Sequence, residues 1–310
     1  MSLEIVINQI LVLFFIILIG YAARKKDLIS EEINKGLSRI MMDITLPALI
    51  IYNIISVELS TELLNNLILL TVITFISYLF VLVLSSIISN KITKDPHRKT
   101  VFKTLLIFAN VGYMGLPVLN AIYPDRGILY GIINNIIFNI ILWTYGVYIF
   151  IQQDNPSSKG IKLNKILSNG LLAVIIGFIL LGLNIKLGPI KDALNSLGGM
   201  TFPLSMLIIG SSLTNVKLST IIKDKHIYYL SLLKLIIIPI IGLFILNQFN
   251  IPDILRNISV ILLAMPSGAI GVILAEQYNG DYKFASEGVF ITTLCSIVTI
   301  PLIIVLIDIL

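Results

Sequence analysis

Long apolar stretches alternate with short polar ones along the whole chain. A helix needs about 20 predominantly apolar residues to cross the hydrocarbon core of a bilayer, and ten stretches approach or exceed this length. They cover residues 5–22, 35–56, 63–89, 101–123, 127–151, 165–185, 190–213, 227–248, 256–278 and 285–308. This pattern predicts ten transmembrane helices.

The composition agrees with a membrane protein. Hydrophobic residues make up 57% of the 310 residues and charged residues only 13%, with a mean hydropathy of +0.98. Soluble domains carry about 25% charged residues. Lipid can cover this much apolar surface because it is itself an apolar solvent. We therefore expect an all-α integral membrane protein.

Residues that usually build catalytic or metal centres are scarce. The single Cys295 excludes a disulfide framework, and His97 and His226 both stand beside basic residues in polar loops. No spacing of Cys, His, Asp or Glu resembles a metal site. We expect neither an enzyme nor a bound metal or other cofactor.

The positive charges predict an orientation in the membrane. Most of the 22 lysines and arginines fall in alternate loops. Because cytoplasmic loops attract basic residues, both termini are expected outside the cell, and the polar stretch 152–165 is expected to be a cytoplasmic linker. The basic residues behind the net charge of +5 then indicate the orientation of a multi-pass cell-membrane protein, and we do not expect nucleic-acid binding.

A shift of 156 residues aligns unusual residues in the two halves of the chain. The aligned pairs are Pro47 and Pro203, Gly112 and Gly268, Gly115 and Gly271, Asp125 and Asp281, and Asn8 and Asn164. Most are helix breakers, which chance matches among Leu and Ile would not favour. Each half has five predicted helices, an odd number, so the second half would enter the membrane inverted. We predict an inverted repeat of residues 1–151 and 166–310.

The stretch ANVGYMGLPVLNAIYPD, residues 109–125, interrupts the fourth apolar segment. Pro117 removes a backbone donor and frees the carbonyl of Tyr113. Gly112 and Gly115 add conformational freedom there. We therefore expect a break in the fourth helix, with a simple proline kink as the alternative.

The stretch AMPSGAIG, residues 264–271, interrupts the ninth segment in the same way. Pro266 frees the carbonyl of Leu262, and Gly268 and Gly271 loosen the next turn. Lipid cannot satisfy freed backbone groups, so the two breaks are expected to meet near the bilayer midplane, buried in protein or lining water. Half-helix N-termini would suit an anion there, and freed carbonyls a cation.

These residues resemble a known family. ANVGYMGLPVL resembles the N-x-G-x-x-G-L-P signature of the auxin efflux carrier family, and LPALIIYNI, MPSGAIGVILAEQY and ITTLCSIVTIPL are similar to its other recurrent stretches. The resemblance spans the whole chain. It implies ten helices in two inverted five-helix repeats, with broken fourth and ninth helices that cross, and a distant relation to bile-acid-type sodium symporters.

The resemblance also implies roles for residues and segments. Asn110, Pro117 and Pro266 would lie at the crossover that receives an organic anion, whereas the family often has Asn at the position of Tyr113. Segments three to five and eight to ten would form a moving bundle on a scaffold of segments one, two, six and seven. Bacterial members described as malate and malonate permeases make such substrates plausible, and a homodimer is implied. The short linker lacks the long cytoplasmic loop of many plant auxin carriers.

Two charged residues fall inside apolar segments. Asp43, four residues before Pro47, either couples transport to H⁺ or a cation or forms a solvated pair with Arg39 at the interface. The side chain of Lys234 either meets a substrate anion or a carboxylate inside the membrane, or it extends its ammonium to the interface.

Uncharged polar residues also stand inside the segments. Asn135 and Asn139 share one helix face and are expected to hydrogen-bond between helices. Hydroxyl groups near the prolines are expected to satisfy freed backbone groups, with substrate contact as the alternative. They belong to Thr45, Thr201, Ser205 and Ser267.

Together these features predict a secondary transporter for a small mono- or dicarboxylate, coupled to H⁺, to Na⁺ or to neither. The expected site comprises Asn110, Gly112, Tyr113, Gly115, Pro117, Pro266, Ser267, Gly268 and Gly271. The alternatives are a channel, although no segment carries a full polar stripe, and a membrane sensor for a small anion, although no soluble signalling domain is evident.

Overall fold

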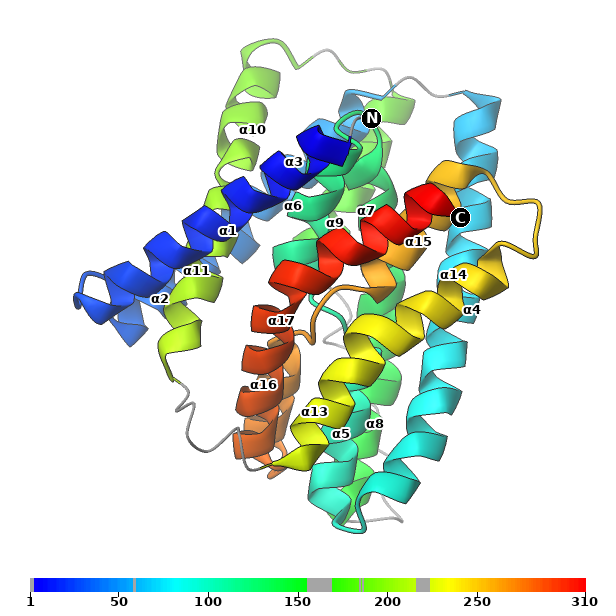
Figure 1. Ribbon diagram of the computed structural model, residues 1–310. Coiled ribbons are helices and arrows are strands. Elements are labelled where there is room, and N and C mark those ends of the chain that lie inside the picture. The colour runs from blue at the N-terminus through cyan, green and yellow to red at the C-terminus, as the bar shows by residue number, and fades with distance from the viewer. Residues whose placement is uncertain (1–2, 58–59, 155–168, 184, 186, 216–223) are drawn as a thin grey trace. The chain divides into compact units, whose positions relative to one another are not determined.

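The structure is a computed structural model that describes residues 3–57, 60–154, 169–183, 185, 187–215 and 224–310 (Figure 1). Helices account for most of these residues, and the only strand-like pairing among them is a bridge between Ala109 and Ser267. The all-helical fold expected from the sequence is confirmed. Residues 155–165 of the predicted linker, Asn164 included, lie outside the described residues.

Six helical stretches in the described part of the chain are long and apolar enough to cross a bilayer. They are Glu31–Ile55, Thr61–Ile92, Gly127–Gln153, Pro189–Ser212, Lys225–Leu246 and Tyr282–Ile309. Val111–Ile122 and Asn169–Gly182 are shorter apolar helices. A chain with this many apolar helices is a multi-pass membrane protein. Helices occupy each of the ten predicted segments, but that all ten cross the bilayer remains a prediction.

The chain forms two compact units, and each takes segments from both halves of the sequence. Unit 1 comprises Met1–Asn65, Leu116–Ile132 and Leu167–Asn215, and unit 2 comprises Asn66–Gly115, Ile133–Ile166 and Val216–Leu310. Segments one, two, six and seven thus fall in unit 1, and segments three, eight, nine and ten in unit 2, the grouping that the family resemblance implies. The fourth and fifth segments contribute to both units. The compact units therefore do not coincide with the predicted repeats 1–151 and 166–310, which describe the order and direction of the helices.

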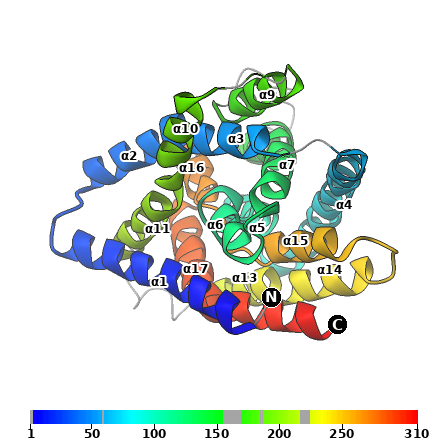
Figure 2. The same ribbon diagram turned by 90° about the horizontal axis from the view of Figure 1, so that it is seen from above.

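Unit 1 is built on three pairs of closely packed helices. Its elements are α1 (Leu3–Lys25), α2 (Glu31–Ile40), the π-helical turn η1 (Met41–Thr45), α3 (Leu46–Ile55), α6 (Leu116–Ile122), the start of α7 (Gly127–Ile141), α9 (Asn169–Gly182), α10 (Pro189–Gly199), α11 (Thr201–Ser212) and the short η5 (Leu213–Asn215). Helix α1 packs against α11, and α3 packs against α9 and α10 (Figure 2). Small residues allow this contact: Gly210 lies against the backbone of Ile17, and Gly177 against Ile54.

Unit 2 contains the two broken segments. Its elements are most of α4 (Thr61–Ile92), α5 (Pro96–Ile107), η2 (Val111–Gly115), the rest of α7, η3 (Leu142–Gly146), α8 (Val147–Asp154), α13 (Lys225–Leu232), η6 (Leu233–Ile237), α14 (Ile238–Leu246), α15 (Asp253–Leu263), α16 (Ile270–Gln277) and α17 (Tyr282–Ile309). Helices α13, α16 and α17 all pack against α5, and α14 packs against α15 (Figure 1).

Three π-helical turns precede prolines. The turns η1, η2 and η6 end two residues before Pro47, Pro117 and Pro239, each the second residue of the following α-helix. Proline lacks an N–H and its ring clashes with the carbonyl four residues earlier, so a wider turn before it relieves both problems. The helix therefore continues through each proline. Pro203, the third residue of α11, likewise lies in the first turn of a helix.

Gly210→Ala tests the packing of α1 on α11. A Cβ atom at residue 210 would collide with the Ile17 carbonyl, which is backbone and cannot rotate away. We expect a loss of about 1–3 kcal/mol in unfolding free energy, the usual cost of overpacking. The measurement is the thermal unfolding midpoint of the purified protein in detergent. Gly182→Ala is the control, since no described atom lies within 4 Å of its Cβ position; equal midpoints for the two variants would contradict the packing.

Candidate functional site

Two non-helical segments of unit 2 pair with each other. Phe108–Asn110 separates α5 from η2, and Ala264–Ala269 separates α15 from α16. The N–H of Asn110 donates to the carbonyl of Pro266 at 2.7 Å, and the N–H of Gly268 donates to the carbonyl of Phe108 at 2.8 Å. These bonds flank the antiparallel bridge between Ala109 and Ser267. The breaks predicted in the fourth and ninth segments therefore meet, and we call this pairing the crossover.

Ser267 forms hydrogen bonds to groups that the breaks leave without helical partners. Its hydroxyl donates to the carbonyl of Leu105 at 2.8 Å, and its N–H donates to the Thr292 hydroxyl on α17 at 3.2 Å. All of these groups are buried. The hydroxyl thus repairs freed backbone, as expected for residues near the prolines.

Asn110 caps the helix that follows the first break. Its Oδ1 accepts the N–H of Tyr113 at 3.3 Å, and its carbonyl accepts the N–H groups of Met114 and Gly115. The residue is only 7% exposed. The side-chain oxygen is thus an N-cap acceptor, while Nδ2 has no partner among the described residues.

The position of the first break corrects the sequence-based expectation. The chain leaves the helix at Phe108–Asn110, whereas Pro117 lies seven residues beyond, inside the continuous helix of η2 and α6. The wider π-helical turn η2 before Pro117 accommodates the proline ring and the missing N–H, so the helix continues. In the ninth segment, by contrast, Pro266 lies within the break itself.

Glycines let the halves of the broken segments approach each other. A Cβ atom on Gly115 would lie 2.9 Å from Leu262 on α15, and one on Gly271 would lie 2.7 Å from Leu105 on α5. Gly268 faces the carbonyls of Phe108 and Ala109 at 3.2 Å from its Cβ position. At Gly112 no described atom lies within 4 Å of that position, so this glycine faces open space.

Lys234 lies in the interior beside the crossover. It is 1% exposed, and its Nζ donates to the carbonyl of Leu106 at 3.0 Å, in the last turn of α5. The alternative that its ammonium extends to the interface is therefore wrong. Lys234 also lines a small cavity of unit 2 together with Ala109 of the crossover.

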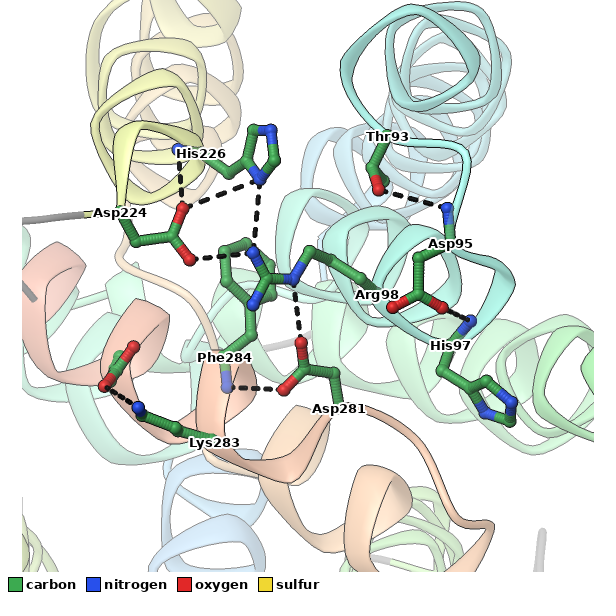
Figure 3. Close-up of polar contacts among 10 residues, drawn as sticks. Thr93, Asp95, His97, Arg98, Asp224, His226, Asp281, Lys283 and Phe284 are labelled. Carbon is green, nitrogen blue, oxygen red and sulfur yellow. Dashed lines mark hydrogen bonds and ion pairs between the residues drawn. The ribbon is translucent and has the colours of Figure 1, made fainter. Parts of the chain in front are cut away.

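An ionic cluster joins three helices at their first turns (Figure 3). Arg98 of α5 donates from Nη1 to Asp224 and from Nε to Asp281, both at 2.8 Å. Asp224 also caps α13 by accepting the His226 N–H, and Asp281 caps α17 by accepting the Phe284 N–H. Burial lowers the pKa of the Arg98 guanidinium, but hydrogen bonds and charges of the two carboxylates outweigh it and raise that pKa. Arg98 therefore stays charged throughout the physiological range.

The scaffold residues singled out from the sequence lie in unit 1. Asp43 is half exposed, accepts a hydrogen bond from Asn169 at 2.8 Å and lies 3.9 Å from Arg39, the pair expected for an interfacial carboxylate. Thr201 donates to Thr45 at 3.0 Å between buried hydroxyls. These two threonines are 156 residues apart, as are Asn110 and Pro266 in unit 2.

The hydrogen bonds of Asn139 differ from the expected bonding between helices. Its Nδ2 donates to the carbonyl of Asn135 at 2.8 Å and to the Asn135 Oδ1 at 3.3 Å. The pair thus bonds within α7 rather than between helices.

Sequence reasoning missed both the ionic cluster and the polar lining of the cavity. In the sequence, Arg98 is one of several basic residues in a loop that is expected to be cytoplasmic. Asp224 and Asp281 are far from it along the chain. Thr74, Ser77 and Tyr78 follow an i, i+3, i+4 pattern on apolar α4, a signal that could have indicated a polar face.

Gly268→Ala and Gly112→Ala form a matched pair that tests the crossover. The methyl group of Gly268→Ala would press on two carbonyl oxygens, so we expect a loss of about 1–2 kcal/mol in unfolding free energy. The methyl group of Gly112→Ala enters open space, and its stability should be unchanged or higher. Thermal unfolding in detergent measures both; a larger loss for Gly112→Ala would contradict the geometry.

Arg98→Gln tests the ionic cluster. It removes two charge-assisted hydrogen bonds and leaves two half-buried carboxylates without their cation, so we expect about 2–3 kcal/mol of destabilisation. Arg126→Gln removes a more exposed pair with Glu62 at 3.7 Å and should cost at most about 1 kcal/mol. Denaturation midpoints that fall equally in both variants would show that the cluster adds no stability of its own.

Comparison with known proteins supplies the family. A family model described as membrane transport protein matches residues 5–304. The chain is 26% identical over 300 residues to the uncharacterized transporter MJ1031 of Methanocaldococcus jannaschii, covering 95% of this chain and 96% of the relative. It is 23% identical over 310 residues to the uncharacterized transporter YfdV of Escherichia coli K12, covering 96% of each. The chain therefore belongs to the auxin efflux carrier family of membrane transport proteins.

Proposed function

We propose that this protein is a secondary transporter that moves a small organic anion across the cell membrane by alternating access. The anion binds at the crossover of the fourth and ninth segments, and unit 2 carries it through the transport cycle. The observation that carries this proposal is the pairing of Phe108–Asn110 with Pro266–Gly268. Broken helices inside an apolar protein are costly and are tolerated where they are buried in protein or line a water-filled cavity, and in transporters such paired breaks form the binding site.

The groups around the crossover suit an anion. The helix of η2 and α6 begins at Val111, so the positive end of its dipole lies at the break, as does that of α16. Gly112 adjoins open space at the same helix start, and the unpartnered Nδ2 of Asn110 is a further donor. Lys234 adds a basic side chain nearby, whose Nζ donates to the carbonyl two residues before Phe108.

Contacts between residues 156 positions apart support the inverted repeat on which this mechanism rests. In a two-fold arrangement, a residue on the axis meets its own counterpart. Thr45 meets Thr201 in unit 1, and Asn110 meets Pro266 in unit 2. Gly115 against Leu262 and Gly271 against Leu105 are reciprocal contacts of the same kind, to within one residue.

Uptake into proteoliposomes tests the proposed function. We expect saturable uptake of labelled malate, malonate or indole-acetate that responds to an imposed pH or Na⁺ gradient. Asn110→Ala removes both the N-cap and the amide donor and should lower the uptake rate at least about tenfold, since such a contact contributes about 1.5–3 kcal/mol.

Two controls separate the roles of Asn110. Asn110→Ser restores a capping oxygen but not the amide, so its uptake should stay low if the amide contacts the anion. Asn139→Ala removes an amide that bonds only within α7 and should transport normally. The proposal fails if no organic anion shows saturable flux, or if Asn110→Ala transports like the wild type; a conductance that does not saturate would indicate a channel.

A further inference from the structure

A small cavity beside the crossover gathers one basic side chain and several hydrogen-bond donors. Lys234 lines it from η6, and Thr74, Ser77 and Tyr78 line it from one face of α4. Asn134 of α7 adds an amide. All these residues belong to unit 2, so the cavity lies within one compact unit.

The size of the cavity limits what it can hold. Its volume is about 20 Å³, and a site for one water molecule needs about 10–15 Å³. A single small ion or a single water molecule therefore fits, and an organic acid does not. Much of the remaining lining is apolar and comes from Val81, Ile107, Leu262 and Leu263.

The polar groups of the lining lack partners within the described part of the chain. The hydroxyl of Thr74 and the Oδ1 of Asn134 are buried without a hydrogen bond, and those residues are 1% and 7% exposed. No described group pairs with the Asn134 amide nitrogen or with the hydroxyls of Ser77 and Tyr78. Unpaired buried polar groups cost free energy, so such a cluster is retained where something else pairs with it.

The charge of the lining is one-sided. No aspartate or glutamate lines the cavity, and none of the described carboxylates lies within 4.0 Å of the Lys234 Nζ. An ammonium has three N–H donors, and the Leu106 carbonyl accepts only one of them. A buried ammonium is costly unless a negative charge lies beside it.

The excess of donors favours an anion over a water molecule or a metal ion. A water molecule accepts only two hydrogen bonds, whereas the ammonium, the hydroxyls of α4 and the Asn134 amide together offer more donors than that. A metal cation would be repelled by the ammonium. A monatomic anion accepts hydrogen bonds from all sides, supplies the negative charge and matches the size of the cavity.

We propose that this cavity is a halide site, in which chloride is the counter-ion of Lys234. The two remaining ammonium donors, the hydroxyls of α4 and the Asn134 amide donate to the ion. Because the ion joins α4, α7 and η6 next to the crossover, its binding stabilises unit 2. An organic anion exceeds the volume of this site, so the inference goes beyond the proposed function and does not depend on which molecule is transported.

A purely structural role for Lys234 predicts different behaviour. A lysine can simply satisfy a carbonyl in the last turn of a helix, as Lys234 does for Leu106 on α5. In that case stability would not depend on halide. Lys234→Gln keeps a donor for the carbonyl and removes the charge, and Lys94→Gln removes a charge from an exposed position outside the cavity lining.

The thermal unfolding midpoint of the purified protein in detergent measures halide binding at pH 7. Sodium chloride, sodium bromide and sodium gluconate are compared at equal ionic strength, because gluconate is too large for the cavity. For the wild type and for Lys94→Gln, chloride or bromide at about tenfold above Kd should raise the midpoint by about 2–4 °C over gluconate, and the rise should saturate. Lys234→Gln should weaken halide affinity at least about tenfold.

Asn134→Asp keeps the test decisive should Lys234→Gln fail to fold. It retains the side-chain shape and places a carboxylate in the cavity, where that carboxylate takes the place of the ion. Its midpoint in gluconate should equal or exceed that of the wild type, and its response to chloride should be lost. Asn139→Asp places the same charge on α7 outside the cavity lining and should keep the response to chloride.

Bromide locates the site directly, because its anomalous X-ray scattering distinguishes it from water. Crystals grown in bromide should show one anomalous peak in hydrogen-bond contact with the Lys234 Nζ. Water in that place would overturn the halide site. So would a wild-type midpoint that does not depend on halide, or a halide response that survives unchanged in Lys234→Gln or Asn134→Asp.

Discussion

Two backbone hydrogen bonds join the unwound residues of the fourth and ninth segments. In a lipid environment every N–H and C=O must find a partner within the protein, and a broken helix loses the partners that an intact helix supplies. Phe108–Asn110 and Pro266–Gly268 provide them for each other. Ser267, Thr292 and Lys234 then satisfy neighbouring backbone groups. The polar groups around this pairing form the candidate site because the fold must leave the helix there.

The ionic cluster and the crossover act on the same helices. Arg98 holds the first turns of α5, α13 and α17, and each of these segments supplies a group near the crossover: the carbonyls of Leu105 and Leu106 end α5, Lys234 follows α13, and Thr292 lies on α17. A helix acts as a rigid element, so a shift at one end is carried to the other. Fixing three helix starts with one guanidinium therefore fixes the register of the atoms that surround the site.

Much of the fold follows from the sequence because its signals are local. Apolar length and helix breakers located the helical segments and the two that are broken. The exact break in the fourth segment could not be read this way, because the π-helical turn before Pro117 accommodates the proline, and the real break depends on a partner about 156 residues away. The polar cavity escaped notice for a similar reason, since Thr74, Asn134 and Lys234 come from three segments that only the folded chain brings together. Arg98 likewise has no local feature that distinguishes it from the other basic residues of the polar loops.

A disulfide cross-link tests the crossover most directly. Ala109 and Ser267 form a non-hydrogen-bonded antiparallel pair. The Cα atoms of such pairs lie about 4.5 Å apart, within the range that a disulfide bridges. With the native thiol removed by Cys295→Ser, the variant carrying Ala109→Cys and Ser267→Cys should oxidise to an intramolecular disulfide in membranes under mild oxidant. A variant with Gly112→Cys in place of Ala109→Cys should oxidise far less. Free thiols that persist at 109 and 267 while remaining reactive to a small alkylating reagent would contradict the paired crossover.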